Sequence, residues 1–295
     1  MRILLTGPGG FLGSALARYW SEYGHELILL ARPTSSLKHL DDLMSMHLLR
    51  ASTFEEIAGL VQEAAPDAIV HTACSYGRNG ETPLDVMKAN HVLGSVLLQA
   101  VLDNTTSEKG PVSFLNAGTV LSPDVGLYAL SKTQFSSWGA ALASQYPERL
   151  RFIDILLQQM YGPGDDQSKF TTRVIKTCMR NEPYLALTAG EQKRDFIHID
   201  DVVRAYDCIL NQRAVFAAND SIDVGLGEAV TMRDFAVLTK QIAGASTALD
   251  FGAVPYRINE PMLCVANTNR IRCLGWQPKF SLAEGLAFTL DKMST

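Results

Sequence analysis

The chain has 295 residues, of which 47% are hydrophobic and 19% charged, a composition typical of a globular protein with a sizeable core. Its net charge is −5 and it has no basic tract, which argues against a nucleic acid as partner. No apolar run is long enough to span a membrane. The five cysteines are scattered, which predicts a reducing cytoplasm and no metal cluster.

The first predicted elements form a phosphate site. A short buried strand over residues 3–5 leads into a glycine-rich turn, and a helix follows. In this order, bare backbone N–H groups and a helix N-terminus face an anion. The spacing is Gly-x-x-Gly-x-x-Gly rather than the usual dinucleotide fingerprint. The residues of the turn that we expect to bind the cofactor are Gly7, Gly9, Gly10, Phe11, Leu12 and Gly13.

The second predicted strand, residues 26–31, indicates which cofactor is bound. A strand in this position normally ends in an acid that accepts hydrogen bonds from the ribose hydroxyls of NAD. Here Arg32, Ser35 and Lys38 follow instead, and a guanidinium binds phosphate in a fork. The alternative is an exposed basic loop without a ligand. We therefore expect NADP, with NADPH as the hydride donor.

The remaining elements of the first half alternate regularly. Strands are predicted at 47–50, 67–73, 112–115 and 151–157, with helices at 55–64, 84–102 and 127–146 between them. Such alternation predicts an α/β fold, a doubly wound parallel Rossmann sheet, over residues 1–157. Residues 158–295 lack it and are predicted to form a smaller substrate-binding lobe, with a segment near 194–224 returning to the first domain. Asp200 and Asp201 are predicted to be a helix N-cap pair with a structural role.

A tyrosine and a lysine on one helix supply the candidate chemistry. Tyr128 and Lys132 are four residues apart, so both project from one face. The lysine charge is expected to favour phenolate and so to lower the pKa of Tyr128. Thr119, after the preceding strand, offers a third hydrogen bond to a substrate oxygen. Alone the pair is a weak signal, since a core tyrosine and a solvated lysine would match it equally well. His71 is interpreted as a strand-end histidine without a chemical role.

Several motifs occur in an order that resembles the extended short-chain dehydrogenase/reductases, which are nucleotide-sugar epimerases, dehydratases and reductases. They are Thr6-Gly7-x-x-Gly10-x-x-Gly13, residues 67–73, Tyr128-x-x-x-Lys132, Tyr161-Gly162-Pro163 and residues 194–201. The resemblance spans nearly the whole chain. It implies a Rossmann domain, a carboxyl-terminal nucleotide-sugar lobe and a homodimer formed through the helices at 84–102 and 127–146.

Within that superfamily the chain resembles the CDP-abequose synthases and related reductases of nucleotide-linked 4-keto-6-deoxy sugars. The resembling stretches include residues 76–79, 160–170 and 187–196. The resemblance implies cofactor contacts from Ala73, Asn90 and Lys132. It also implies two ligands of the sugar-nucleotide pyrophosphate: Arg194, which matches the superfamily's motif well, and Arg257, which matches it more loosely. Four further residues are expected to orient the sugar or the base, with a surface position as the alternative for each: Tyr76, Arg78, Asp165 and Lys169.

Departures from the superfamily narrow the expected reaction. Ala117 stands where many members carry a hydroxyl, so Thr119 must supply it. Gly118 and Thr119 replace the acid pair of the dehydratases, which leaves elimination of water without proton carriers. The sequence therefore favours NADPH-dependent reduction of a C4 ketone. The expected substrate is a nucleotide-linked 4-keto-6-deoxyhexose or 4-keto-3,6-dideoxyhexose, with CDP as the expected nucleotide. The alternatives are an NAD-dependent nucleotide-sugar 4-epimerase and a non-catalytic nucleotide-binding regulatory protein.

Overall fold

The computed structural model describes residues 1–41, 43 and 46–294, which divide into two units. The first unit is Met1–Leu156 with Ile209–Ile222, and the second is Leu157–Cys208 with Asp223–Thr295. The sequence places the boundary at residue 157, and the segment that returns to the first unit begins at Ile209.

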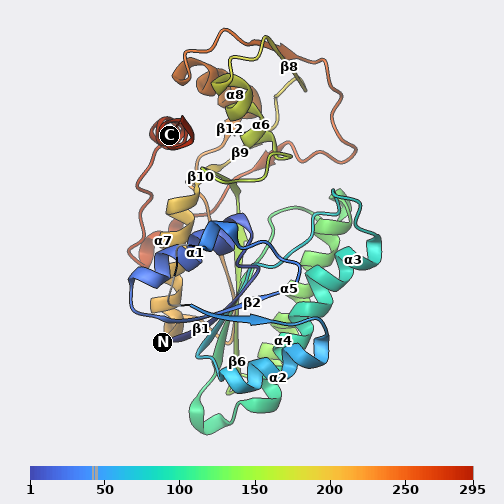
Figure 1. The fold of residues 1–295 in the computed structure, drawn as a ribbon, viewed down its shortest axis with the longest axis vertical. Helices are drawn as coiled ribbons and strands as arrows, with labels where there is room; N and C mark the ends of the chain where they lie inside the picture. The colour runs from blue at the N-terminus through green and yellow to red at the C-terminus, as the bar shows by residue number, and fades with distance from the viewer. Residues whose placement is uncertain (42, 44–45, 295) are drawn as a thin grey trace. The chain divides into compact units, whose positions relative to one another are not determined.

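A seven-stranded parallel sheet organises the first unit, as predicted (Figure 1). Its order is β11-β6-β5-β4-β1-β2-β3, the Rossmann arrangement in which the chain starts in the middle and winds outward in both directions. The strands are β1 (Arg2–Thr6), β2 (Glu26–Ala31), β3 (His47–Arg50), β4 (Ala68–His71), β5 (Val112–Ala117), β6 (Leu150–Leu157) and β11 (Asn219–Val224).

Helices cover both faces of this sheet. α2 (Phe54–Ala64), α4 (Leu93–Asn104) and α5 (Leu127–Gln145) lie on one face, and α1 (Phe11–Glu22) lies on the other (Figure 1). The core under α4 and α5 is aromatic: the fully buried rings of Phe114 and Phe152 stack with centroids 5.6 Å apart, and Phe135 packs edge-on against Phe152. This packing fixes α5 on the sheet.

The single helix predicted over residues 84–102 is a composite in the structure. Thr82 and Asp85 form a capping box, and Pro83 opens α3 (Pro83–Met87). One π-helical turn, η2 (Lys88–Val92), then leads into α4. The wider turn accompanies the burial of Asn90, whose side chain bonds to the segment after β4.

The second unit has helices around three small sheets. The sheets pair β10 (Phe196–His198) with β7 (Gln159–Tyr161), β9 (Lys193–Arg194) with β12 (Val230–Thr231) and β14 (Leu263–Cys264), and β13 (Ala248–Phe251) with β8 (Tyr184–Leu187). Its core gathers Tyr161, Phe196, Phe235 and Leu286. The helices are α6 (Phe170–Met179), α7 (Ile199–Asn211, shared with the first unit), α8 (Met232–Ile242), α9 (Asn269–Cys273) and α10 (Leu282–Ser294).

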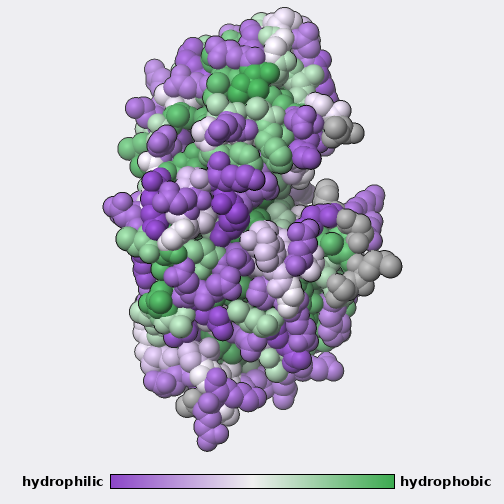
Figure 2. Space-filling view, turned by 90° about the vertical axis from the view of Figure 1, so that its left-hand side faces the viewer, coloured by the Kyte–Doolittle hydropathy of each residue, from purple (hydrophilic) through white to green (hydrophobic). Residues whose placement is uncertain are grey.

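Short 3-10 turns complete the chain: η1 (Lys38–Leu40), η3 (Ser107–Lys109), η4 (Pro123–Val125) and η5 (Arg213–Val215). Hydrophilic residues cover most of the face shown in Figure 2, with hydrophobic ones in separate patches. Among the described residues, no helix combines the length and the apolar composition needed to cross a bilayer. Within the same ranges, no group of His, Cys, Asp and Glu side chains is arranged to hold a metal ion.

Candidate active site

The glycine turn lies between β1 and α1, at the carboxyl edge of the sheet. Gly10 precedes the helix and gives it no side-chain cap, so the N-terminus of α1 is bounded by bare backbone. Gly7 adopts a positive φ of 68°, and a Cβ on Gly13 would lie 2.1 Å from the Gly7 carbonyl oxygen. The turn can therefore reach the helix only with glycine at both positions. This cradle fits the pyrophosphate of a dinucleotide.

The basic turn follows β2 on the same edge. The Ser35 N–H donates to the Arg32 carbonyl at 3.0 Å, which closes the turn, and Lys38 begins η1. The side chains of Arg32 and Lys38 are exposed and Ser35 is half-buried. The structure thus brings the three predicted 2′-phosphate ligands into one short segment beside β1.

The predicted catalytic residues lie on two neighbouring segments. Thr119 comes just after β5, while Tyr128 and Lys132 occupy the first two turns of α5. The Thr119 Oγ1 accepts the Leu121 N–H at 3.2 Å, so its hydroxyl proton is left for donation to another oxygen. Thr119 and Tyr128 are half-buried, whereas Lys132 is only 1% exposed.

The pKa of Tyr128 differs from the prediction. Burial raises it well above the ordinary value, and neighbouring Tyr76 and Cys74 raise it further, whereas the Arg78 charge opposes them. The predicted lowering by Lys132 is therefore wrong, because the loss of water around the phenol outweighs the nearby positive charges. Tyr128 therefore keeps its phenolic proton at neutral pH.

Lys132 is a buried cation without a direct partner. Among the described residues, its ammonium makes no hydrogen bond and no ion pair, and burial lowers its pKa, against the attraction of Cys74 and Asp154. An unpaired buried charge is costly to the fold. Such a group is typical of a functional site, where a ligand oxygen completes its hydrogen bonds.

A buried polar row that the sequence analysis missed lies in register on four adjacent strands. Thr6, His71, Asn116 and Asp154 pair successively across β1, β4, β5 and β6. Thr6 Oγ1 and His71 Nδ1 are 2.8 Å apart, and Asn116 donates to Asp154 at 2.7 Å. Burial and the Lys132 charge lower the pKa of His71 to about 3. A polar residue near the end of each strand was the signal in the sequence.

Ala73 and Asn90 connect this row to α5. The Ala73 N–H donates to Thr6 Oγ1 at 3.3 Å, next to the glycine turn. The Asn90 amide binds the Ser75 N–H at 2.6 Å and the Ser75 carbonyl at 2.9 Å, and it donates to Ser131 Oγ at 3.0 Å. Asn90 therefore holds the segment after β4 against α5. A direct contact of Asn90 with a cofactor stays a prediction.

In the second unit, the two predicted pyrophosphate arginines share a partner that the sequence analysis missed. Glu260 accepts from Arg194 at 2.5 Å with one oxygen and from Arg257 at 2.8 Å with the other. Arg194 is nearly buried, and Arg257 is largely exposed. Because the single Glu260 carboxylate lies between two guanidinium groups, the three side chains together carry a net charge of +1.

Asp165 and Lys169, also predicted to bind substrate, bind each other. Their ion pair measures 2.8 Å, and Asp165 is buried. Burial raises the pKa of Asp165, against the effect of Lys169. The pair closes the turn before α6, and its contact with a substrate stays a prediction.

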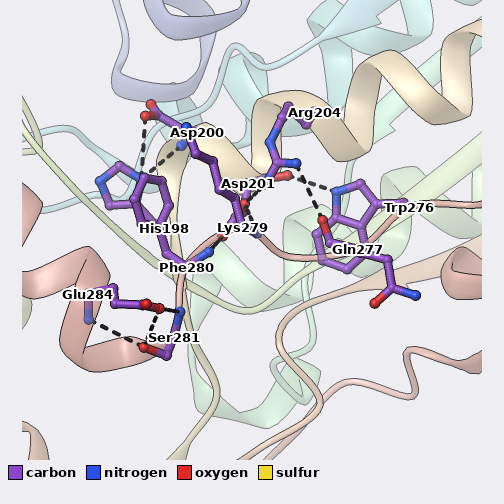
Figure 3. A network of polar contacts seen from close by, with 10 residues as sticks. All are labelled: His198, Asp200, Asp201, Arg204, Trp276, Gln277, Lys279, Phe280, Ser281 and Glu284. Atoms are coloured by element: carbon purple, nitrogen blue, oxygen red, sulfur yellow. Dashed lines mark hydrogen bonds and ion pairs between the residues drawn. The ribbon is translucent and has the colours of Figure 1, made fainter.

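Asp200 and Asp201 lie in the first turn of α7, so the predicted N-cap position is wrong (Figure 3). Asp201 instead accepts the backbone N–H groups of Lys279 at 2.7 Å and Phe280 at 3.2 Å, and it also pairs with Arg204. The Trp276 indole donates to the Asp201 carbonyl at 3.2 Å. Asp201 therefore anchors the segment before α10, which is a structural role.

The model of the NAD dependent epimerase/dehydratase family matches residues 3–225 of the chain. Two CDP-abequose synthases are similar over almost their whole length. That of Salmonella muenchen is 30% identical over 97% of this chain and 95% of its own. That of Salmonella typhimurium is 27% identical over 99% and 98%. Among solved structures, UDP-glucose 4-epimerase of Thermotoga maritima, determined with UDP-glucose, shares the fold with a TM-score of 0.84 and 22% identity over 100% of this chain and 99% of that one.

These similarities confirm the resemblance and the fold class inferred from the sequence. The family match includes the glycine turn, the Tyr128 and Lys132 pair and all of the central sheet except Arg2. The chain belongs to the NAD dependent epimerase/dehydratase family.

Proposed function

We propose that the chain reduces the C4 ketone of a CDP-linked 4-keto-6-deoxyhexose or 4-keto-3,6-dideoxyhexose with NADPH, in deoxysugar biosynthesis. The observation that carries the proposal is the Tyr128 and Lys132 pair at the start of α5, on the same sheet edge as the glycine turn. Thr119 lies between β5 and α5. The full-length similarity to CDP-abequose synthases supports this substrate class.

The chain's own residues account for the proton chemistry. Bound NADPH supplies a hydride for C4, and negative charge develops on the C4 oxygen. Tyr128 donates its phenolic proton to that oxygen, and its raised pKa keeps the proton in place until then. The Thr119 hydroxyl donates a hydrogen bond to the same oxygen. Lys132 stabilises the phenolate that remains and holds the ribose hydroxyls of the cofactor through its unpaired ammonium.

The preference for NADPH rests on the turn after β2. Arg32, Ser35 and Lys38 present one hydroxyl and two positive charges there, and no acid follows Ala31 before Asp41. A 2′-phosphate gains hydrogen bonds from such a set. An unphosphorylated ribose would find no carboxylate acceptor.

The nucleotide is assigned to the second unit. We propose that Arg194 and Arg257 bind its pyrophosphate, since together with Glu260 they retain one positive charge. CDP is chosen over other nucleotides from the names of the similar synthases. Tyr76 and Arg78, in the first unit after β4, are proposed to contact the sugar.

C4 epimerisation with tightly held NAD is the second candidate function, favoured by the fold shared with a UDP-glucose 4-epimerase. It uses the same Thr119, Tyr128 and Lys132. The missing acid after β2 and Ala117 count against it.

The test is nicotinamide absorbance during incubation with CDP-4-keto-6-deoxyglucose, with NADPH and NADH in parallel. Consumption of NADPH much faster than NADH is expected, and NMR then gives the product's configuration at C4. If neither cofactor is consumed while C4 exchanges in a saturated nucleotide sugar, the epimerase replaces the reductase.

A further inference from the structure

Arg50, the last residue of β3, binds the backbone of residues 32–35, the first part of the turn that follows β2. One nitrogen of its guanidinium donates to the carbonyl oxygens of Arg32 and Pro33, each at 2.9 Å, and approaches that of Ser35 at 3.4 Å. The register of β2 and β3 pairs Ala31 with Arg50, so the side chain starts where the turn leaves the sheet. A single side chain from the neighbouring strand therefore contacts three carbonyl oxygens of one turn.

This turn borders the glycine cradle. A Cβ on Gly9 would lie 2.3 Å from the Ser36 carbonyl oxygen, so the backbones of the two segments are in direct contact. Displacement of the turn would move the wall of the cradle on the side where Arg32 and Ser35 lie.

The three carbonyls also create an electrostatic requirement. Carbonyl oxygens carry partial negative charge, and several that converge on one point repel an anion placed nearby. The Arg50 guanidinium donates to these oxygens and places a full positive charge beside them, which offsets their partial negative charge. Without Arg50, a dianionic phosphate bound at this turn would face carbonyl oxygens whose partial negative charge is not compensated.

We propose that Arg50 is a specificity-determining positioning residue: by holding and neutralising the carbonyls of the turn after β2, it makes this turn accept the 2′-phosphate of the cofactor. The inference rests on the proposed use of NADPH. Arg50 acts through the turn, while Arg32, Ser35 and Lys38 make the direct contacts.

Calorimetric binding of two adenine nucleotides to the full chain tests this role without turnover. 2′,5′-ADP, which is adenosine with one phosphate on O2′ and one on O5′, carries the phosphate in question, and 5′-AMP lacks only that phosphate. Arg50→Gln removes the charge and the fork, and we expect it to weaken the binding of 2′,5′-ADP about tenfold or more, the loss typical of a charge-assisted hydrogen bond, with the binding of 5′-AMP unchanged. Arg50→Lys keeps the charge and is expected to fall between. Arg149→Gln is the matched control, since Arg149 also donates to a backbone carbonyl, that of Leu102, at the opposite end of the strands.

The outcomes separate the two proposals. If the unmodified chain binds both nucleotides equally, the proposed use of NADPH fails. If it prefers 2′,5′-ADP and Arg50→Gln keeps that preference, NADPH stands and the role of Arg50 is overturned. Equal weakening of both nucleotides would also overturn it, because it would show a structural role alone. Should Arg50→Gln not fold, Arg50→Lys decides: unchanged preference contradicts the inference and a reduced one supports it.

Discussion

The rings of Tyr76 and Tyr128 stack with their centroids 4.7 Å apart and their planes 26° from parallel. On Tyr76 lies the guanidinium of Arg78, whose central carbon is 5.3 Å from the ring centroid. The proposed proton donor is therefore covered by an aromatic side chain from the loop after β4. Gly77 and Gly80 of this loop both adopt positive φ, which gives it a backbone that few other residues would allow.

Tyr76→Ala is expected to lower the pKa of Tyr128. The substitution admits water to the phenol and removes the neighbouring hydroxyl, and both changes favour the phenolate. Because a proton donor works only while protonated, the alkaline loss of NADPH oxidation should move to lower pH. The pH dependence of kcat/KM measures it. Tyr76→Phe keeps the stack and should shift the profile less. An unchanged profile in Tyr76→Ala would show that the stack does not control Tyr128.

Much of the site was predictable because its parts are local. The first strand, the glycine turn and the helix after it are contiguous in the sequence, and Tyr128 and Lys132 share a face because of helical spacing alone. The alternation of strands and helices likewise fixed the parallel sheet. These features need no knowledge of distant contacts.

The parts that were missed depend on residues far apart in the sequence. Glu260 meets Arg194 across 66 residues, and Asn116 meets Asp154 across 38. The pKa of Tyr128 was predicted from its neighbour in the helix, whereas burial under Tyr76 decides it. The N-cap prediction for Asp200 and Asp201 was wrong because Asp201 instead accepts a hydrogen bond from the backbone N–H of Lys279, 78 residues later in the sequence.

Tyr128→Phe should nearly abolish turnover and leave the cofactor bound. The ring and its stack remain, but the proton donor is lost, which typically costs about 10²–10⁴-fold in rate. Stopped assays give kcat, and nicotinamide fluorescence gives the affinity for NADPH. Tyr146→Phe, at the end of the same helix, serves as the control and should keep full activity. Wild-type turnover in Tyr128→Phe would remove Tyr128 from the mechanism.

Asp154→Asn should weaken NADPH binding through the pKa of Lys132. The Asp154 carboxylate raises the pKa of Lys132 against burial, so its removal lowers that pKa further. We expect poorer NADPH binding at alkaline pH than in the unmodified protein, with affinities converging as pH falls. Fluorescence titration across pH measures this. Asp103→Asn, an exposed acid on α4, is the control. If the NADPH affinity of the Asp154 variant depends on pH as that of the unmodified protein does, Asp154 has no electrostatic effect on Lys132.

Trp138→Arg should disrupt the proposed homodimer. Trp138 and Leu127 on α5 are 51% and 53% exposed, and Leu84 on α3 is 57% exposed, so these helices carry the exposed apolar side chains that the expected dimer interface requires. A charge in such an interface would remain unpaired when buried. Sedimentation should show a dimer for the unmodified chain and a monomer for the variant. Val215→Arg, at an apolar site in η5 that is 65% exposed, should stay dimeric. A monomeric unmodified chain would refute the dimer itself.

His71→Asn should make the fold less sensitive to acid. In the folded chain the pKa of His71 is about 3, against an ordinary value of 6.5, so between these values the unfolded chain binds the additional proton. The stability that depends on neutral His71 is therefore present above pH 6.5 and is lost as the pH falls towards 3. From pH 7 to pH 5 the loss amounts to about 2 kcal/mol by proton linkage. Urea unfolding at both pH values measures it. His91 and His198, whose pKa values burial also lowers, titrate alike in both proteins, so the difference isolates His71. Parallel losses in the two proteins would show that His71 is protonated in the fold.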